Sequence, residues 1–312
     1  MGRRPEPYLP AVLESLKDAV DLVVVNDNSG KVRSGNRQAL ERSTLARDGR
    51  VAVFEAPFVN FSDARNRCLA HMRGPLRYLL AADFWILMVD CDEVHGAGIE
   101  FITRRVLPWV GTSAGVVDSY FVQFMHDPGY FLSMDRRHNL LFRHTPELAW
   151  ELDVHEHLAG LAKGRLCLPY LYYHMGYVAP TSRIRDKWTQ YRSLGDPTYA
   201  EGALESMSAQ QMFATEVPRS MHYTWRLPKA FDVLGDPRAL RDPSADEFCR
   251  MVDAWYLHPG RRMRASARRM NFKLRLFWRA VQAGVAGLPF SLWGGLWRLA
   301  TSATAPCRGR SR

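Results

Sequence analysis

The sequence has few cysteines, and their spacing gives them no evident structural role. Its 312 residues include five cysteines, an odd number, and no two of them form a Cys-x-x-Cys pair. This argues against a disulfide framework and against a zinc knuckle, and it favours a reducing compartment. The amino end also lacks the charged and then apolar pattern of a secretory signal peptide. We therefore expect a cytoplasmic location.

Acidic residues are absent from the last part of the chain. None follows Asp253, whereas residues 254–312 hold twelve lysines and arginines, so the formal net charge of +10 arises in this tail. The rest of the chain is close to neutral. No recognisable nucleic-acid-binding fold accompanies the basic tail, so nucleic acid is not an expected partner.

The tail also contains a long uncharged stretch. Residues 261–279 have the pattern of a basic helix, and residues 280–297 carry no charge for eighteen positions. Four glycines and Pro289 interrupt this stretch, which approaches the ~20 residues of a membrane-spanning helix. A basic, Trp-rich segment is typical of a helix in the membrane interface, here on an anionic surface at the inner face of the cytoplasmic membrane. A C-terminal core helix with a solvated basic face is the equally weighted alternative.

An unbroken apolar run at residues 84–89 precedes three acids, Asp90, Asp92 and Glu93. Its shortness and its aromatic and β-branched residues predict a strand buried on both faces, as in a parallel sheet. Ligands of open α/β sheets bind at the carboxyl ends of strands. A turn just after Val89 would bring both aspartates together, and two carboxylates with room for water and phosphate suit Mg²⁺ or Mn²⁺. An acidic loop that only caps the strand is the simpler interpretation.

The order of the predicted elements indicates an α/β fold. Strands and helices alternate through the first 95 residues, which is typical of a doubly wound, mostly parallel sheet. Asp27 follows the first strand, so we expect it on the same sheet edge as Asp90 and Asp92, with a nucleotide lying across that edge. Helices are predicted at 11–19, 36–48, 64–72, 99–110, 181–194 and 248–257, and residues 60–63 offer caps for the helix at 64–72. Strands are predicted at 21–25, 51–54, 84–89 and 116–125, with shorter strands between 126 and 176.

Five segments together resemble the family 2 glycosyltransferases of the GT-A fold, especially bacterial cell-envelope sugar transferases. They are residues 23–29, 63–66, 85–93, 150–156 and 172–177. The resemblance implies a GT-A-like domain over 1–195, with a nucleotide-binding half (1–95) and an acceptor half (96–195). A helical extension (196–260) and the basic amphipathic tail (261–312) would follow.

The resemblance also implies an activity and its residues. The expected reaction is a metal-dependent, inverting transfer, of hexosyltransferase type, from a nucleotide-diphosphate sugar to an envelope glycan or a lipid-linked acceptor. Asp27 would contact the nucleobase, and Arg65 and Asn66 would approach the donor. Asp90 and Asp92 would bind Mn²⁺ or Mg²⁺, with Asp92 the more direct ligand. His174 would be a further metal ligand or a diphosphate contact.

Glu156 is the implied base that deprotonates the acceptor, and Asp153 is the alternative. Each of these roles has a simpler explanation: Asp27 would cap a turn, Arg65 would lie on a helix surface, and His174 would pack among tyrosines. A further set of basic residues lies on the helix predicted at 181–194: Arg183, Arg185 and Lys187. They could steer phosphate, but we expect them to form a solvated helix face.

The sequence departs from the family at its start. The family's first strand, central in its sheet, precedes the helix that corresponds to residues 11–19, and we find no strand there. Loss of this central strand would expose apolar surface and unpaired main-chain groups. Three explanations stay open: the true start lies upstream of Met1, the domain is compromised, or residues 2–7 are a remnant of the strand.

Two other functions are compatible with the motif at 90–92. A haloacid-dehalogenase-like phosphatase would use Asp90 as its nucleophile. That family, however, places the motif on its first strand, whereas here the motif follows the third strand and precedes Glu93. A non-enzymatic module that binds a membrane surface would use the acids only to cap loops.

Overall fold

The computed structural model describes residues 1–2, 4–30, 34–96, 98–111, 114–196, 221–222, 227–236 and 245–257, with isolated residues between 260 and 298. Most of the predicted tail (261–312) and much of the predicted extension (196–260) lie outside these residues. The division into domains therefore stays a prediction. Among the described helices, none combines the length and the apolar character that crossing a bilayer requires.

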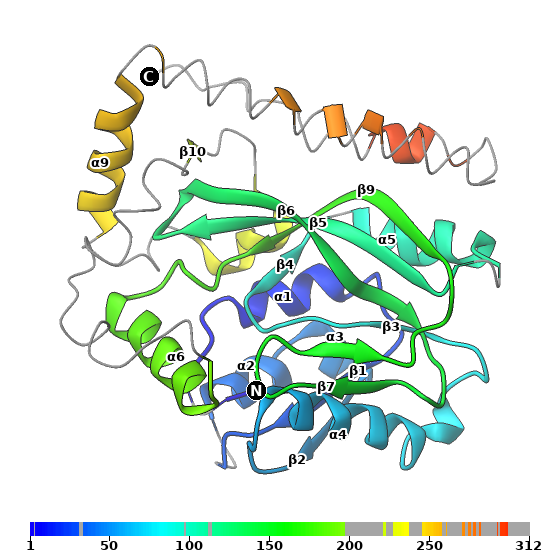
Figure 1. Ribbon diagram of the computed structural model, residues 1–312. Helices are drawn as coiled ribbons and strands as arrows, with labels where there is room; N and C mark the ends of the chain where they lie inside the picture. The colour runs from blue at the N-terminus through cyan, green and yellow to red at the C-terminus, as the bar shows by residue number, and fades with distance from the viewer. Residues whose placement is uncertain are drawn as a thin grey trace.

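A six-stranded mixed sheet forms the larger layer of the molecule (Figure 1). Its strand order is β10–β6–β5–β9–β4, and β3 also pairs with β6. Within the described part of the chain, β5 and β9 form its one parallel pair, and the other pairs are antiparallel. The strands are β3 (Trp85–Leu87), β4 (Glu93–His95), β5 (Val116–Met125), β6 (Asp127–Arg143), β9 (Arg165–His174) and β10 (Met221–His222).

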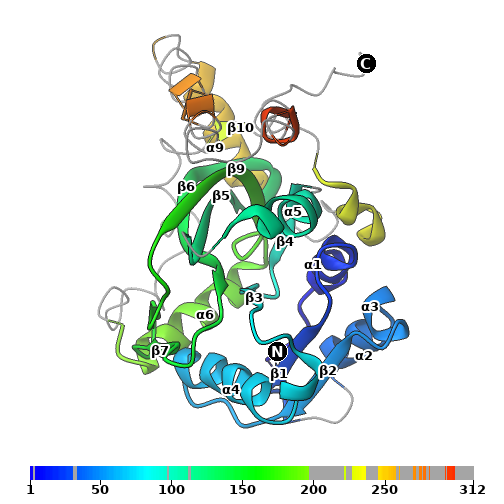
Figure 2. The same cartoon turned by 90° about the vertical axis from the view of Figure 1, so that its right-hand side faces the viewer.

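A separate two-stranded sheet contains β1 (Val23–Asp27) and β2 (Val51–Glu55), which are parallel. The helices α2 (Gly35–Glu41) and α3 (Thr44–Arg47) connect these strands. A small hairpin of β7 (Ala149–Glu151) and β8 (His157–Ala159) lies nearby. Figure 2 shows β1, β2 and α4 (Phe61–Arg73) at the base of the molecule, with the larger sheet above them.

The α/β class is confirmed, but the expectation of a mostly parallel sheet is wrong in detail. The apolar run at 84–89 forms only the short strand β3, which is partly exposed and pairs antiparallel with β6. β1 and β3 consequently belong to different sheets. The physical reason is that a short apolar run specifies a buried strand but does not specify its partner.

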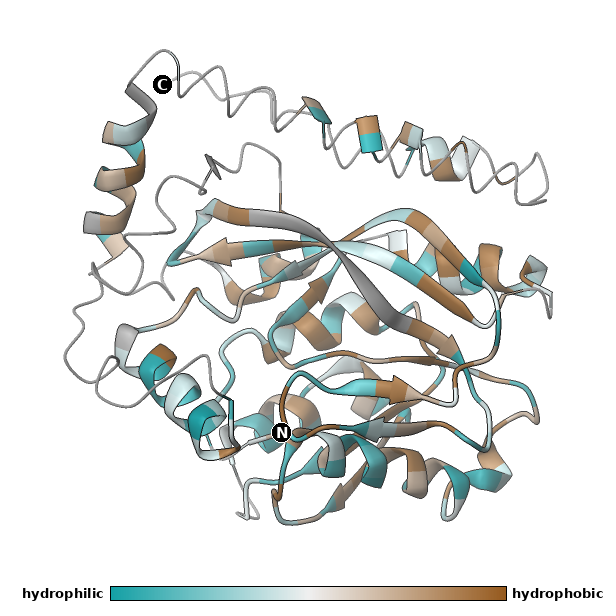
Figure 3. Ribbon diagram, viewed as in Figure 1, coloured by the Kyte–Doolittle hydropathy of each residue, from teal (hydrophilic) through white to brown (hydrophobic). Residues whose placement is uncertain are grey.

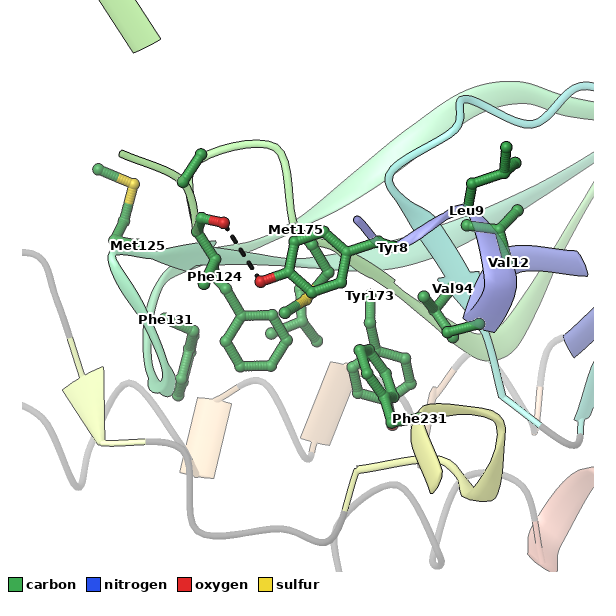
Figure 4. Close-up of a cluster of buried hydrophobic side chains, with 14 of the residues drawn as sticks. Tyr8, Leu9, Val12, Val94, Phe124, Met125, Phe131, Tyr173, Met175 and Phe231 are labelled. Carbon is green, nitrogen blue, oxygen red and sulfur yellow. Dashed lines mark hydrogen bonds between the residues drawn. The ribbon is translucent and has the colours of Figure 1, made fainter. Parts of the chain in front are cut away.

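The helix α1 (Leu9–Leu16) forms the centre of the largest core cluster. A proline in its first turn fixes the backbone at the helix start. Figure 4 shows Leu9 and Val12 beside Val94 of β4, and the Tyr8 hydroxyl donating to the Val178 carbonyl at 3.2 Å. Burial of each such Leu or Val side chain contributes about 1.5–3 kcal/mol. The core thereby attaches the amino-terminal segment firmly to the larger sheet.

Two helices bound the region where β1 and β3 end. α4 begins at the predicted cap, where the Asn60 side chain accepts the Asp63 N–H at 2.6 Å. α6 (Thr181–Ser193) approaches the start of α4, where the rings of Phe61 and Tyr191 lie 5.5 Å apart. Figure 3 shows that hydrophilic residues dominate the visible face of α6. The remaining described helices are η1 (Arg77–Leu79), α5 (Gly98–Phe101), η2 (Ile102–Val106), η3 (Leu107–Trp109), η4 (Lys229–Leu234) and α9 (Ala245–Leu257).

Candidate functional site

A tight turn follows β3 and places Asp90 and Asp92 at its end. The buried Glu93 carboxylate accepts the Asp90 N–H at 3.0 Å, and the Glu93 N–H donates to the Asp90 carbonyl at 3.1 Å. The Asp92 carbonyl accepts the Met175 N–H at 2.8 Å, which ties the turn to the segment after β9. The turn expected after Val89 is therefore present.

The Asp92 carboxylate faces two basic side chains. His174 Nε2 lies 3.5 Å from Asp92 Oδ1, and Lys187 Nζ lies 3.7 Å from Asp92 Oδ2. Burial acts to raise the pKa of Asp92, but the attraction of His174 and Lys187 outweighs it and holds the pKa well below its usual range. Conversely, burial acts to lower the pKa of Lys187, and Asp92 more than compensates, so the pKa lies above its ordinary value. Asp92 is therefore ionised throughout the physiological range.

Lys187 is the site residue that the sequence prediction placed wrongly. Its ammonium lies over the rings of Tyr177 and Tyr191, at 5.5 and 6.0 Å from their centroids, rather than on a solvated face. The signal was available, because Ile184, Lys187 and Tyr191 are spaced three and four residues apart and so share one side of α6. Ile184 is buried, and it turns this side toward the interior.

The hydrogen bonds around His174 fix the orientation of its ring. Gln123 donates from Nε2 to the Phe124 carbonyl at 3.1 Å, which leaves its Oε1 facing His174 Nδ1 at 2.6 Å. Nδ1 must therefore carry the proton that Gln123 accepts. In the neutral ring, the lone pair then resides on Nε2, the atom that faces Asp92. This is the arrangement in which a histidine binds a metal ion.

Gly176 leaves open the space where these groups converge. A Cβ atom at this position would lie 2.6 Å from Asp92 Oδ2, 2.8 Å from His174 Nε2 and 3.0 Å from Lys187 Nζ. A carboxylate oxygen and an imidazole nitrogen beside an open space fit Mn²⁺, and a carboxylate also fits Mg²⁺. In the part of the chain that the structure describes, no group of three or more His, Cys, Asp or Glu gathers as a preformed metal site. A cation here would therefore take its other ligands from water and phosphate.

Arg65 connects the acid at the end of β3 to the predicted base. Its Nη2 lies 3.1 Å from Asp90 Oδ1, and its Nη1 lies 3.0 Å from Glu156 Oε1. The guanidinium also covers the Trp150 ring at 4.8 Å from the centroid. Arg65 therefore belongs to the site and not to the helix surface. Asp92 faces His174, whereas Asp90 faces Arg65, so Asp92 is the better placed of the two aspartates for a cation beside His174.

The two candidate bases occupy different surroundings. Glu156 is largely buried beside Arg65, whereas Asp153 is exposed and accepts a hydrogen bond from the Asn60 side chain at 2.5 Å. The loop between β7 and β8 that carries both residues includes two left-handed non-glycine residues, Leu152 (φ 70°) and His155 (φ 55°). Such conformations persist only where the surroundings hold them, as at many functional sites. His155 Nε2 lies 2.9 Å from Asp196 Oδ2, which holds one end of this loop.

Asp27 and Asn66 have clear structural partners. The buried Asp27 carboxylate accepts the Ser29 N–H at 3.0 Å and lies 3.9 Å from Arg37 Nη1. The Asn66 side chain bonds to both main-chain groups of Trp150, at 2.7 and 2.8 Å. Asn66 therefore attaches α4 to β7, and this use of its amide competes with the predicted contact to the donor.

One cavity of about 2450 Å³ collects most of the predicted site. Its lining includes Glu156 and His174 as well as the four acidic and basic residues of the predicted donor site, Asp27, Arg65, Asp90 and Asp92. Asn66 and Asp153 are not among its lining residues. The cavity exceeds the ~300–1,000 Å³ of an ordinary small-molecule site, so there is space for a donor and for more.

Comparison with known protein families gives a match over about half of the chain. The family model described as glycosyl transferase family 2 matches residues 3–161. No curated protein matches the chain. The matched range contains Asp27, Arg65, Asp90, Asp92 and Glu156, whereas His174 and Lys187 lie beyond it. The tertiary structure brings His174 and Lys187 next to residues of the matched segment.

The open space at Gly176 generates the first prediction. We expect Mn²⁺ alone to raise the thermal midpoint of the parent chain. In Gly176→Ala, the added Cβ would contact Asp92 and His174, so we expect the variant to fold but to lose this rise. Gly111→Ala is the matched control, since nothing lies within 4 Å of the added Cβ there. An undiminished Mn²⁺ response in Gly176→Ala would show that cations bind elsewhere.

Proposed function

We propose, because the chain belongs to glycosyl transferase family 2, that it moves a sugar from a nucleotide-diphosphate donor to a hydroxyl of an envelope glycan or lipid-linked acceptor. The family makes it a glycosyltransferase with a nucleotide-sugar donor and an acceptor, which decides against the phosphatase and the non-enzymatic module. The metal dependence, the donor and the kind of acceptor are our proposals. The observation that carries the metal dependence and the diphosphate donor is the convergence of Asp92, His174 and Lys187 beside Gly176. The kind of acceptor is proposed from the resemblance of the sequence to cell-envelope sugar transferases.

The donor would lie along the cavity between Asp27 and Asp92, which both line it. Its base and ribose would lie near Asp27, and its diphosphate near Asp92 and Lys187. A divalent cation bound by Asp92 and His174 would supply Lewis-acid stabilisation of the leaving diphosphate. Lys187 provides a fixed ammonium beside the same position, and it would hold phosphate oxygens once Asp92 has another partner.

The acceptor would approach from the side of Glu156. Its hydroxyl oxygen would bond to the anomeric carbon of the sugar as the bond from that carbon to the diphosphate breaks. The hydroxyl proton would pass to Glu156, and a single in-line displacement would invert the anomeric centre. Arg65 holds the Glu156 carboxylate in place through their 3.0 Å ion pair, so it is a positioning residue in this proposal.

Contact with an anionic membrane surface would depend on the tail at 261–312. Most of that segment lies outside the described residues, so a peripheral position at the membrane stays a prediction from its sequence.

Removal of the Asp92 charge tests the proposed metal site. In the parent chain, Mn²⁺ with UDP, GDP or TDP at about 100 times Kd should stabilise the fold by about 2.7 kcal/mol. That corresponds to a rise in thermal midpoint of about 5 °C. Asp92→Asn should abolish the Mn²⁺-dependent part of the rise, whereas the control Asp153→Asn should keep it. If Asp92→Asn shows the full metal-dependent rise, the proposed site is wrong.

The role of Glu156 is tested by separating binding from transfer. Glu156→Gln keeps the shape of the side chain but removes the base, so we expect donor binding to persist and transfer to slow by about 100-fold or more. Release of nucleoside diphosphate during slow transfer to water measures this without a known acceptor. Asp153→Asn should release it at the parent rate. If Asp153→Asn is the slow variant instead, Asp153 replaces Glu156 as the base.

Lys187→Met separates the cation site from the phosphate site. Without the ammonium, we expect UDP to bind about tenfold more weakly in the presence of Mn²⁺, because a charged phosphate contact is lost. Mn²⁺ alone should bind at least as tightly as to the parent chain, since Asp92 no longer has a competing internal cation. Calorimetric titration measures both affinities, and Arg47→Met, at an exposed position, controls for net charge. Equal weakening of both ligands would contradict this assignment.

A further inference from the structure

Three aromatic side chains line the cavity where α4 and α6 approach each other. Phe58 and Phe61 come from the segment before α4 and from its first residue, and Tyr191 comes from the last turn of α6. The rings of Phe58 and Phe61 lie 5.3 Å apart, and those of Phe61 and Tyr191 lie 5.5 Å apart, with 75° between the planes of each pair. We call Phe61 and Tyr191 the aromatic corner.

The aromatic corner belongs to the cavity wall and not to the hydrophobic core. Both side chains are half-buried, and neither is part of a core cluster among the described residues. Both line the cavity. Aromatic side chains on a cavity wall, with a few polar groups beside them, are typical of sites for small molecules. The corner therefore has the character of a ligand site.

The loop that carries the proposed base passes beside the aromatic corner. The Phe61 N–H donates to the Asp153 carbonyl at 3.3 Å, and the ring of His155 lies 6.3 Å from the ring of Tyr191. Glu156 follows directly in the chain and lines the same cavity. A ligand on the corner is thus next to the loop from which Glu156 would act.

α6 connects the aromatic corner to the proposed diphosphate position. Lys187 and Tyr191 are four residues apart, so they share one side of the helix, and Lys187 Nζ lies 6.0 Å from the centroid of the Tyr191 ring. The same ammonium lies 3.7 Å from Asp92 Oδ2. The corner is therefore one helical turn from the groups that would hold the diphosphate, on the wall that also borders the base.

The polar side chains around the aromatic corner favour a sugar as its ligand. Thr189, Gln190 and His155 are exposed and line the same cavity. Burial raises the pKa of Tyr191 to about 12, so its hydroxyl keeps its proton at neutral pH. The electronegative face of an aromatic ring attracts the C–H groups on one face of a pyranose, and the polar groups can bond to the hydroxyls at its edge. A lipid alcohol or a lipid phosphate has no such ring.

We propose that the aromatic corner binds a pyranose ring of the acceptor, stacked on Tyr191 with its edge against Phe61. The hydroxyl that receives the transferred sugar belongs to this pyranose and faces Glu156. The angle of 75° between the two rings restricts the orientation of the bound sugar. The inference rests on the proposed function, because it names the acceptor class of the same site: a saccharide, and neither a lipid alcohol nor a lipid phosphate.

The experiment uses three simple pyranosides as probes: methyl β-glucopyranoside, methyl β-galactopyranoside and methyl α-mannopyranoside. Each is titrated into the full chain with Mg²⁺ and whichever of UDP, GDP and TDP stabilises the chain most. Saturation-transfer NMR measures the Kd and identifies the sugar protons that contact the protein. We expect at least one probe to bind, with saturation concentrated on the C–H groups of one ring face. Hexanol, a lipid alcohol without a ring, should not displace it.

Substitutions in the corner test which side chains hold the probe. Tyr191→Leu keeps apolar bulk but removes the aromatic face, so the Kd of the pyranoside should rise about tenfold. Tyr191→Phe keeps the face, and its Kd should stay within about threefold of the parent value. Phe61→Leu is an independent test and should raise the Kd by at least about threefold. Tyr78→Leu is the matched control, since Tyr78 is exposed and is not among the lining residues of the cavity.

The proposal is overturned if no pyranoside binds, if hexanol displaces the pyranoside, or if Tyr191→Leu binds it as tightly as Tyr78→Leu does. The probe must also bind beside an intact donor. Glu156→Gln is therefore saturated with whichever of UDP-glucose, GDP-mannose and TDP-glucose stabilises it most. Exclusion of the pyranoside by that donor would assign the corner to the donor sugar and would also overturn the proposal.

The stabilisation of the parent chain by the nucleoside diphosphate and Mg²⁺ separates this inference from the function on which it rests. If the stabilisation is present and no pyranoside binds, the acceptor assignment alone is wrong. If the stabilisation is absent, the proposed function itself is wrong.

Discussion

The turn that Glu93 closes is the constraint on which the site depends. Its buried carboxylate holds the Asp90 N–H, and the chain then continues directly into β4. β4 pairs with β9 so that Glu93 and His174 are opposite each other. This register places His174 within reach of Asp92, one residue earlier in the turn, and it puts Gly176 at the point of convergence. This hydrogen bond and the register of β4 with β9 thus bring together Asp92 and His174, which lie far apart in the sequence.

The acidic side chains of the site each face a basic side chain. Asp92 has Lys187 and His174, and Arg65 lies between Asp90 and Glu156. Partly buried ion pairs of this kind compensate for the cost of removing charges from water, but they add little stability beyond that. A phosphorylated ligand with its cation can therefore exchange partners with these residues without leaving an isolated charge. The site is suited to ligands that bring charges of both signs.

Local features of the fold follow from the sequence. The strand predicted at 116–125 is β5 with the same bounds, and the cap at Asn60 and the helix after residue 180 are where local patterns place them. Most of the predicted site residues line one cavity, because acids at strand ends stay at strand ends whichever way the strands pair. The pairing itself could not be predicted. A three-residue strand such as β3 has no pattern that distinguishes a parallel from an antiparallel partner.

Long-range side-chain contacts were equally beyond sequence analysis. Asn66 bonds to the main chain of Trp150, and Arg65 forms an ion pair with Glu156. Nothing in the sequence around these residues indicates either contact. The inward direction of Lys187 was accessible from the spacing of Ile184 and Tyr191, but the high charge of the helix obscured it. The family resemblance thus identified candidate site residues, and the residues that complete their surroundings required the fold.

The shared guanidinium of Arg65 has a consequence for the order of events in the site. Its two ion pairs make the electrostatic states of Asp90 and Glu156 interdependent, and such coupling is reciprocal by thermodynamic necessity. If a cation neutralises Asp90, the Arg65 guanidinium interacts with Glu156 alone. If a proton neutralises Glu156, the guanidinium interacts with Asp90 alone. In the proposed arrangement, the nucleotide side and the hydroxyl side of the site would therefore be coupled through Arg65.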